Sequence, residues 1–273
     1  AELGFHAEID ETGETLEENS AIKAQTIWDW IKAHQLTHEV DGVFADDSLG
    51  LGMRRLSIID ISTGKQPIYN EDKSLVIVLN GEVYNYKSLR EDLIQKGHKF
   101  TTTSDTETVL HCFEEYGTGC FDKLNGMYAF AVYDFKNKKV TVARDRIGEK
   151  PLYYYADDEK LLFASELKSI IATGMIEKKI CKEALCQYLQ LTYIPAPLTI
   201  LENVYKLCPG NYMEIDLNGG FEIKTYWNVT YSEKTLITDY EECKKELRKV
   251  MFDAVEECMV SDVPVGAFLS GGI

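Results

Sequence analysis

A short, fully apolar segment, residues 75–79, constrains the fold more than any other part of the sequence. Leucine and β-branched residues fill all of its positions. It is too short for a helix and apolar on both faces, which is typical of a strand buried between two layers. Asn80 and Gly81 follow, and because this pair tolerates positive φ, we expect the strand to stop there and the chain to reverse or open. Glu82 comes next, so polar groups are expected at the mouth of a hydrophobic core.

The other segments predict hairpins that alternate with amphipathic helices. Strands are expected at 41–44, 49–61, 126–134, 139–144, 151–155 and 161–165, with two or three more within 199–228. Helices are expected at 21–33, 87–97, 106–116, 166–173 and 240–258, the last with Leu247, Val250, Met251 and Val255 along its apolar stripe. Consecutive strands without a helix between them favour layered antiparallel sheets with helices outside, and not a doubly wound parallel sheet.

Composition narrows the class of protein. The sequence has 273 residues, which favours two domains, or one large domain with a fragment of another. Asp and Glu exceed Lys and Arg by 45 to 29 and no basic stripe stands out, so neither nucleic-acid binding nor attachment to anionic membranes is expected. No apolar run is long enough to span a bilayer, and the N-terminal segment lacks the features of a secretory signal, so we expect a cytoplasmic protein.

The spacing of cysteines and histidines predicts no metal site. The seven cysteines include no CxxC pair, which favours reduced and mostly buried thiols. Of the five histidines, His34 and His38 have the only metal-ligand spacing, being four residues apart. No carboxylate or third histidine is placed to complete a site with them, so we interpret them as a solvated pair.

Three groups of polar or small residues stand out beside these elements. Arg54 and Arg55 point to opposite faces if segment 49–61 is a strand, so one of them must face the interior or a pocket and needs an anionic partner. Ser104 and Asp105 precede a predicted helix and are natural N-caps for it. Residues 270–272, Ser-Gly-Gly, follow a predicted strand, where small residues let backbone N–H groups approach a phosphate.

An ordered series of motifs resembles the glutamine-hydrolysing asparagine synthetases over about residues 41–273. The motifs are Arg55-Leu56-Ser57-Ile58-Ile59-Asp60, Asn80-Gly81-Glu82-Val83-Tyr84-Asn85, Ser104-Asp105-Thr106-Glu107, residues 124–130, residues 143–154, residues 163–168 and residues 263–272. The resemblance implies an α+β fold, a four-layer αββα sandwich of two antiparallel sheets of the N-terminal nucleophile glutaminase type, followed by the beginning of an α/β nucleotide-binding domain. It implies a glutaminase-like domain at 1–228 with an atypical segment 1–40, a linker at 229–239 and the start of an ATP-pyrophosphatase (asparagine synthase) domain at 240–273.

The resemblance also implies a glutamine site, whose roles the residue chemistry supports. Arg55 would grip the α-carboxylate in a bidentate pair, while Glu82 and Asp105 would hold the α-ammonium. Asn80 and the N–H of Gly81 would form the oxyanion hole for a tetrahedral intermediate. The slot for the glutamine side chain would be lined by the backbone of four successive residues, Leu56, Ser57, Ile58 and Ile59.

At the other end of the sequence, Leu269, Ser270, Gly271 and Gly272 resemble the start of a pyrophosphate-binding loop. The family uses this loop with Mg²⁺ and ATP to adenylate aspartate, and ammonia from glutamine then travels through a tunnel and displaces AMP. The resemblance therefore implies glutamine, aspartate and ATP as small-molecule partners, and a homodimer as a family-level expectation. Because the Asp and Ser of that loop are not among these 273 residues, neither ATP nor Mg²⁺ is expected to bind well to this chain.

Two stretches depart from the family's pattern. The family's nucleophile is an N-terminal cysteine with its α-amine as base, whereas this sequence has Ala1 followed by Glu2. Where the family carries His-Arg-Gly-Pro-Asp, residues 34–39 here are His-Gln-Leu-Thr-His-Glu. Both departures fall before the glutamine-holding motifs, so we hypothesise a replaced or engineered N-terminal segment on an otherwise ordinary synthetase. We expect glutamine hydrolysis to be abolished or crippled.

Two alternatives remain open at this point. The chain is a catalytically silent module that binds glutamine or scaffolds a partner, or it is a homologue of the β-lactam synthetase type, which uses only ATP. Proteins of the second type have little reason to keep Arg55, Asp105 and the Asn80-Gly81-Glu82 motif together, and this sequence keeps all of them.

Overall fold

The computed structural model describes residues 42–46, 49–53, 59–60, 63–230 and 237–266. The strands are β1 (Gly42–Asp46), β2 (Leu49–Met53), β3 (Ile68–Tyr69), β4 (Leu75–Val83), β5 (Gly126–Asp134), β6 (Lys139–Arg144), β7 (Tyr153–Ala156), β8 (Leu161–Ala164), β9 (Val204–Lys206), β10 (Asn211–Asp216) and β11 (Gly220–Thr225). The helices are α2 (Tyr86–Gln95), α3 (Asp105–Tyr116), the 3₁₀ helix η1 (Gly117–Asp122), α4 (Leu167–Ala172), α5 (Lys182–Leu191) and α6 (Tyr240–Cys258). The helix predicted at 21–33 lies outside the described residues.

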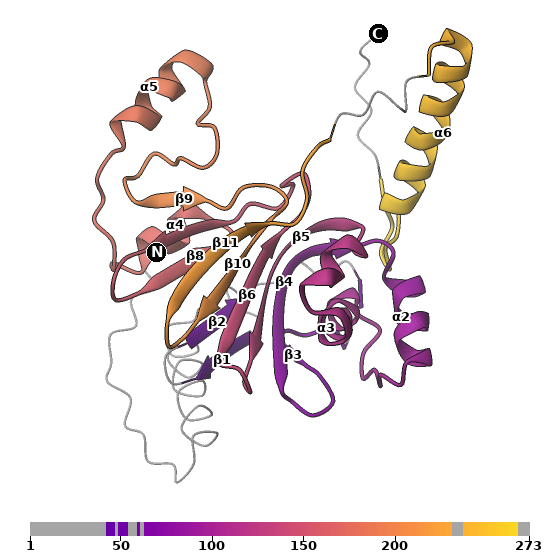
Figure 1. Cartoon of the computed structure of the whole chain (residues 1–273), viewed down its shortest axis with the longest axis horizontal. Helices are drawn as coiled ribbons and strands as arrows, with labels where there is room; N and C mark the ends of the chain where they lie inside the picture. Colours follow the sequence, from indigo (N-terminus) through magenta and orange to yellow (C-terminus); the bar gives the residue numbers. More distant parts are fainter. Residues whose placement is uncertain (1–41, 47–48, 54–58, 61–62, 231–236, 267–273) are drawn as a thin grey trace.

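The main sheet has six strands in the order β11-β10-β6-β5-β4-β3, and each neighbouring pair is antiparallel (Figure 1). A second sheet has the order β8-β7-β9, and β1 pairs with β2; both of these sheets are also antiparallel. The prediction of an α+β fold with antiparallel sheets and helices is therefore confirmed. The hairpin of β5 and β6 has the predicted bounds, because two apolar runs are separated by a short polar turn at residues 135–138.

The central strand β4 corrects one prediction. It does not stop at Asn80-Gly81 but continues to Val83, with Gly81 paired to Tyr128 of β5. Gly81 has a φ of 144°, and a Cβ built on it would lie 2.0 Å from the carbonyl oxygen of Met127. The glycine therefore serves a close approach between two paired strands and not a chain reversal.

Alternating residues of β4 face two different hydrophobic cores. Ile77 and Leu79 belong to a core on one side of the main sheet, to which α2 and α3 contribute Leu93 and Leu110. Val76 and its neighbours on the same face belong to a second core, on the side where the smaller sheets pack. This period of two is why the run 75–79 is apolar at every position, as expected for a strand buried on both faces.

The smaller sheets and α4 complete this packing. The second core includes Leu51 of β2, with Phe163 of β8 packed against it. A third core lies between the β7–β9 sheet and α4, where Ile170 packs with Val204 and Tyr153. Of the strand predicted over 49–61, residues 49–53 form β2, residues 59 and 60 are not part of a strand, and the others lie outside the described residues. Asp60 has a positive φ of 48°, which explains why an extended strand cannot continue through it.

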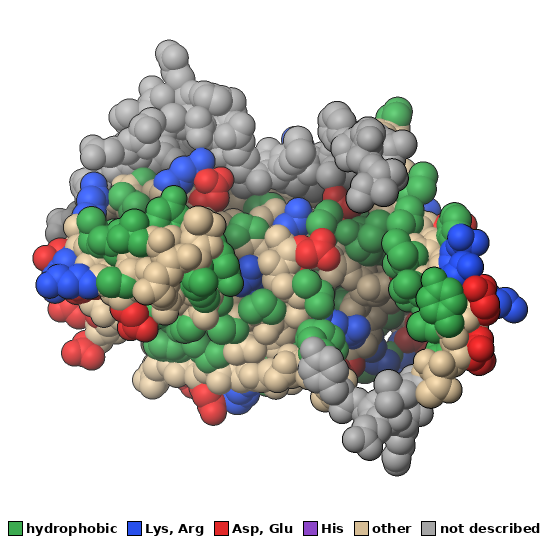
Figure 2. All heavy atoms as spheres, turned by 90° about the horizontal axis from the view of Figure 1, so that it is seen from above, with side chains coloured by type: hydrophobic (Ala, Val, Ile, Leu, Met, Phe, Trp, Pro, Cys, Tyr) green, Lys and Arg blue, Asp and Glu red, His purple; other side chains and the backbone are tan. Residues whose placement is uncertain are grey.

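Helix α6 has the predicted bounds and apolar stripe, but none of its residues is buried. Leu247 and Met251 are each more than half exposed, and Figure 2 shows hydrophobic side chains along this helix. Among the described residues, no helix combines the length and the hydropathy that crossing a membrane would require.

The cysteines correct a second prediction. All seven are free thiols, but only Cys112 and Cys120 are buried, so the expectation of mostly buried thiols is wrong. Cys186, Cys243 and Cys258 are exposed because they lie on α5 and α6, the helices that pack least against the rest of the chain.

Candidate functional site

The polar end of β4 is the first part of the site. Asn80 and Glu82 flank Gly81 and pair with Ala129 and Met127 of β5. The amide Nδ2 of Asn80 donates a hydrogen bond to the Oγ of Ser165, directly after β8, at 3.1 Å. This contact joins the two sheets at the point where the predicted oxyanion-hole residues lie, and it fixes the orientation of the Asn80 side chain.

Asp105 is held at the start of α3, against the same end of β4. Ser104 is the N-cap, as its predicted capping role requires, and its Oγ accepts a hydrogen bond from the backbone N–H of Thr106. The Asp105 Oδ2 accepts a hydrogen bond from the backbone N–H of Val83 at 3.0 Å, and its Oδ1 accepts one from Thr106 at 2.9 Å. The helix N-terminus favours a negative charge here, which allows Asp105 to be almost fully buried.

Glu82 is a buried carboxylate close to Asp105. Burial raises the pKa of Glu82; the positive charge of Lys150 opposes this shift, and the negative charge of Asp105 adds to it. Two acids and one lysine from three segments therefore share one region, which carries an excess of negative charge. Such a region favours a small cationic group, because a cation would offset the cost of keeping both carboxylates out of water.

Lys150 was missed as a site residue, and its position depends on the loop that precedes it. The Asp145 carboxylate accepts hydrogen bonds from the backbone N–H groups of all four residues from 147 to 150. The Arg144 guanidinium donates to the carbonyl oxygens of Gly148 and Lys150, at 2.7 Å each. The motif at 143–154 carried the family resemblance, but nothing in its spacing indicated that an acid and an arginine would shape one loop.

The segment that follows Arg55 reaches the same helix end. The Asp60 Oδ2 accepts a hydrogen bond from the backbone N–H of Thr103, two residues before Asp105, at 2.8 Å. Burial alone would raise the pKa of Asp60, but hydrogen bonds from Thr63 and Thr103 outweigh it and lower that pKa. Of the predicted slot residues, Ile59 is described, and its side chain lies in the hydrophobic core beside β4.

The structure therefore brings together four of the predicted site residues, Asn80, Gly81, Glu82 and Asp105. The remaining predicted site residues lie outside the described residues: Ala1, Arg55, Leu56, Ser57, Ile58, Leu269, Ser270, Gly271 and Gly272.

The C-terminal end of α6 contacts this site. Burial raises the pKa of the Tyr84 hydroxyl, and a hydrogen bond with Cys258, at the end of α6, adds to the shift. Asp262 accepts a hydrogen bond from the backbone N–H of Asp60 at 2.7 Å. The segment after α6 therefore lies beside the strand end and the acids described above.

Comparison with known proteins places this geometry in a family. Residues 32–227 match the glutamine amidotransferase domain family, and residues 246–273 match the asparagine synthase family. Asparagine synthetase (glutamine-hydrolyzing) 1 of Bacillus subtilis is 44% identical over 85% of this chain and 36% of that protein. A putative asparagine synthetase of Methanocaldococcus jannaschii is 39% identical over 84% of this chain and 47% of that protein. An amidase of Gibberella zeae is 36% identical over 84% of this chain and 34% of that protein.

Solved structures agree on the fold. The glutamine phosphoribosylpyrophosphate amidotransferase of B. subtilis, complexed with ADP and GMP, matches 76% of this chain and 40% of its own, with a TM-score of 0.50 and 20% identity. A structure described as the allosteric regulatory enzyme of purine biosynthesis matches the same shares with a TM-score of 0.53. The chain spans less than half the length of the curated relatives above. On the extent of the matched domain and the identity to these synthetases, the chain belongs to the class II glutamine amidotransferase family, with its last residues matching the asparagine synthase domain.

Proposed function

We propose that this chain is the glutamine-binding part of an amidotransferase of the asparagine synthetase type. The observation that carries the proposal is the pair of buried carboxylates, Glu82 and Asp105, at the junction of β4 and α3. The α-ammonium of a free amino acid is the cation that these acids would hold, by charge-assisted hydrogen bonds. Arg55, which lies outside the described residues, stays the predicted partner of the α-carboxylate.

The reaction that follows from this placement is release of the side-chain amide nitrogen. A nucleophile that attacks the carboxamide carbon forms a tetrahedral intermediate, whose oxyanion Asn80 and the Gly81 N–H would stabilise. Collapse of the intermediate expels ammonia and leaves an acyl group for hydrolysis to glutamate. The expectation that Ala1 leaves this chain without its nucleophile stays a prediction, as does delivery of ammonia to an ATP-activated aspartate. The roles of residues 269–272 towards ATP and Mg²⁺ rest on the resemblance alone.

The finer fold and domain assignments belong to the same proposal. Three hydrophobic cores, between α2–α3 and the main sheet, between the sheets, and between the β7–β9 sheet and α4, support a four-layer αββα sandwich of the N-terminal nucleophile type. We assign this sandwich to residues 1–228 and the start of an α/β nucleotide domain to 240–273, joined by 229–239. The cytoplasmic location inferred from composition stays a prediction.

Isothermal titration calorimetry tests the binding step with two ligands. L-Glutamine carries the α-ammonium, whereas glutaramate has the same carboxamide and carboxylate without it. We expect Glu82→Gln and Asp105→Asn to weaken glutamine binding by about tenfold or more, because each removes a charge-assisted hydrogen bond worth ~1.5–3 kcal/mol. Glutaramate binding should change little in either variant.

Glu183→Gln, on the exposed surface of α5, is the matched control and should leave both titrations unchanged. Equal loss of both ligands in Glu82→Gln would contradict the role given to this carboxylate. Glutamate release measured on the same samples distinguishes a chain that only binds glutamine from one that hydrolyses it. Binding without release supports a silent glutamine-binding chain, and turnover refutes the expected loss of hydrolysis.

A further inference from the structure

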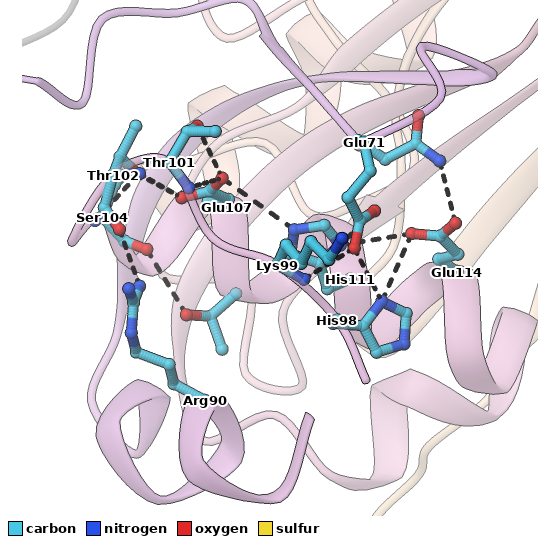
Figure 3. Close-up of polar contacts among 12 residues, drawn as sticks. Glu71, Arg90, His98, Lys99, Thr101, Thr102, Ser104, Glu107, His111 and Glu114 are labelled. Atoms are coloured by element: carbon cyan, nitrogen blue, oxygen red, sulfur yellow. Dashed lines mark hydrogen bonds and ion pairs between the residues drawn. The ribbon is translucent and has the colours of Figure 1, made fainter. Parts of the chain in front are cut away.

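A second polar cluster lies on the outer part of the helical layer, away from the residues discussed so far. Three segments form it: the turn between β3 and β4, the loop after α2, and the middle of α3. Its members, here named the Glu-His cluster, are Glu71, His98, His111 and Glu114 (Figure 3). One ligand atom from each residue lies within 4.8 Å of all the others.

Four histidine-to-carboxylate distances in the cluster lie close to the edge length of a coordination tetrahedron. The Nδ1 of His111 lies 3.2 Å from Glu114 Oε2 and 3.4 Å from Glu71 Oε2. The Nδ1 of His98 lies 3.6 Å from the same Glu114 Oε2 and 3.6 Å from Glu71 Oε1, the other oxygen of that carboxylate. A tetrahedral zinc site with bonds of ~2.0–2.1 Å has ligand-to-ligand distances of about 3.3–3.4 Å. The four distances given above are within a few tenths of an ångström of this value, and all four ligand atoms lie within 4.8 Å of one another. A cation of that size is therefore accommodated when the four side chains close around it.

The outer contacts of the two histidines fit metal binding as well. Each directs its Nδ1 into the cluster, which leaves its Nε2 for a second carboxylate. The Nε2 of His98 lies 3.5 Å from Glu115, and that of His111 lies 3.9 Å from Glu107. In metal sites the non-ligating ring nitrogen commonly faces a carboxylate or a carbonyl, which fixes the tautomer. His111 is fully buried, and within the described part of the chain its Nε2 has no hydrogen-bond partner.

The two carboxylates are oriented in the same way. Glu71 accepts a hydrogen bond from the backbone N–H of Lys99 at 2.8 Å, and Glu114 accepts one from Asn70 Nδ2 at 2.9 Å. Both side chains are roughly a third exposed, so a metal ion can reach the cluster from solvent. All four ligand side chains therefore have supporting contacts from the chain itself.

The acidic residues around the Glu-His cluster give it a negative charge that favours binding of a cation. Four carboxylates, those of Glu71, Glu107, Glu114 and Glu115, surround the two imidazoles. Lys96 pairs with one of them, Glu115, at 3.1 Å. With neutral imidazoles, the other acids retain a negative charge that one dication would largely cancel.

We propose that the Glu-His cluster binds one divalent transition-metal ion of the zinc class in a closed, tetrahedral, structural site. Four protein ligands leave no open position, so the ion would hold the α2–α3 connection against α3 and would not take part in catalysis. Sequence spacing could not reveal this site, because only His111 and Glu114 share an element and the other two ligands come from distant segments.

Metal binding to the full chain tests the proposal. After treatment with a chelator and its removal, we expect Zn²⁺ titration to show one equivalent that raises the melting temperature. Co²⁺ should give the intense visible absorption of a tetrahedral site, without the thiolate charge-transfer band that coordination by any of the seven cysteines would produce. The variants His98→Gln and Glu114→Gln should each lose this equivalent or weaken it by at least tenfold, because each removes a ligand.

Glu91→Gln, an exposed acid on α2, is the control and should retain the equivalent. Both ligand variants change side chains that are partly exposed, so their folding can be checked by circular dichroism before titration. Equal metal stoichiometry in the parent and in both variants, or no zinc equivalent in the parent, would overturn the proposal.

Discussion

Glu82 shows how a single residue can oppose folding and serve binding. Its carboxylate is buried beside Asp105, and Lys150 does not fully offset the resulting rise in its pKa. Protein sites that bind charged ligands commonly keep such groups at some cost in stability. The cost is smallest when a ligand cation is present, so the same residue links stability to occupancy.

The pH dependence of stability gives a direct check on Glu82. Because its folded-state pKa lies above the ordinary value of 4.5, the protonated form stabilises folding below that pH. This contribution is lost as the pH rises through the folded-state pKa. We therefore expect Glu82→Gln to be more stable than the parent at neutral pH, and the two to converge in acid. Urea unfolding at a series of pH values measures this; a parent chain that is more stable at neutral pH would contradict it.

The role of Asp145 in shaping the loop before Lys150 could not be predicted from the sequence. One carboxylate accepts hydrogen bonds from a run of consecutive backbone amides and so shapes the loop that brings Lys150 to Glu82. From the sequence alone, two adjacent charged residues such as Asp145 and Arg146 would be expected in a surface turn. Only the folded loop shows that the carboxylate is buried and that its partners are main-chain groups.

At the scale of elements, the pairing of β4 with β5 depends on two glycines. Gly81 and Gly126 each face the backbone of the opposite strand: a Cβ on Gly126 would lie 2.1 Å from the Glu82 carbonyl oxygen. These contacts fix the strand register on both sides of Glu82. The positions of the site residues therefore follow from backbone packing as much as from their own side chains.

Alanine substitutions at these glycines provide a matched test. We expect Gly81→Ala and Gly126→Ala each to destabilise the chain by about 3 kcal/mol or more, because rigid backbone must move to admit the Cβ. Gly119→Ala, in η1, has nothing within 4 Å of its new Cβ and should change stability by at most about 1 kcal/mol. Urea unfolding measures all three, and equal stabilities for Gly81→Ala and Gly119→Ala would contradict the packing argument.

Element bounds followed well from the sequence where local and tertiary preferences agreed. Lys139–Arg144 and Tyr240–Cys258 were predicted with the bounds that the structure shows. Asn80-Gly81 was misread because its turn preference is overridden by pairing with β5, a contact between residues about fifty positions apart. The carboxylates of the candidate site were predicted from the family motifs, whereas Lys150 and the Glu-His cluster depend on long-range packing that no local pattern encodes.

At the scale of the whole molecule, stability is unevenly distributed. Strands β4 and β5 are almost fully buried over most of their length, while α6 has no buried residue. Most of the stability of a helix in a protein comes from packing of its apolar face, and α6 has little such packing within the described part of the chain. The chain therefore has a rigid sheet region and a helix held mainly by its C-terminal end, through contacts such as that of Asn125 with Glu257.

Hydrogen exchange can measure this contrast. We expect amides of α6 to exchange at least a hundredfold faster than those of β4 and β5, because local unfolding of α6 exposes little buried surface. Peptides covering 75–83, 126–134 and 240–258, followed by mass spectrometry, give the comparison directly. Equal protection of α6 and β4 would show that this helix is packed more firmly than its exposure indicates.

Helix α3 has its first residue, Asp105, in the candidate glutamine site and two members of the Glu-His cluster, His111 and Glu114, further along. Asp105 and His111 are six positions apart, about 9 Å along the helix axis. Any free energy by which an ion in the cluster changes the affinity for an amino acid at Asp105 must act equally in the opposite direction. Measuring either affinity with and without the other ligand would give the same coupling constant. A thermodynamic cycle can therefore establish whether α3 couples the two sites energetically or only supports the fold.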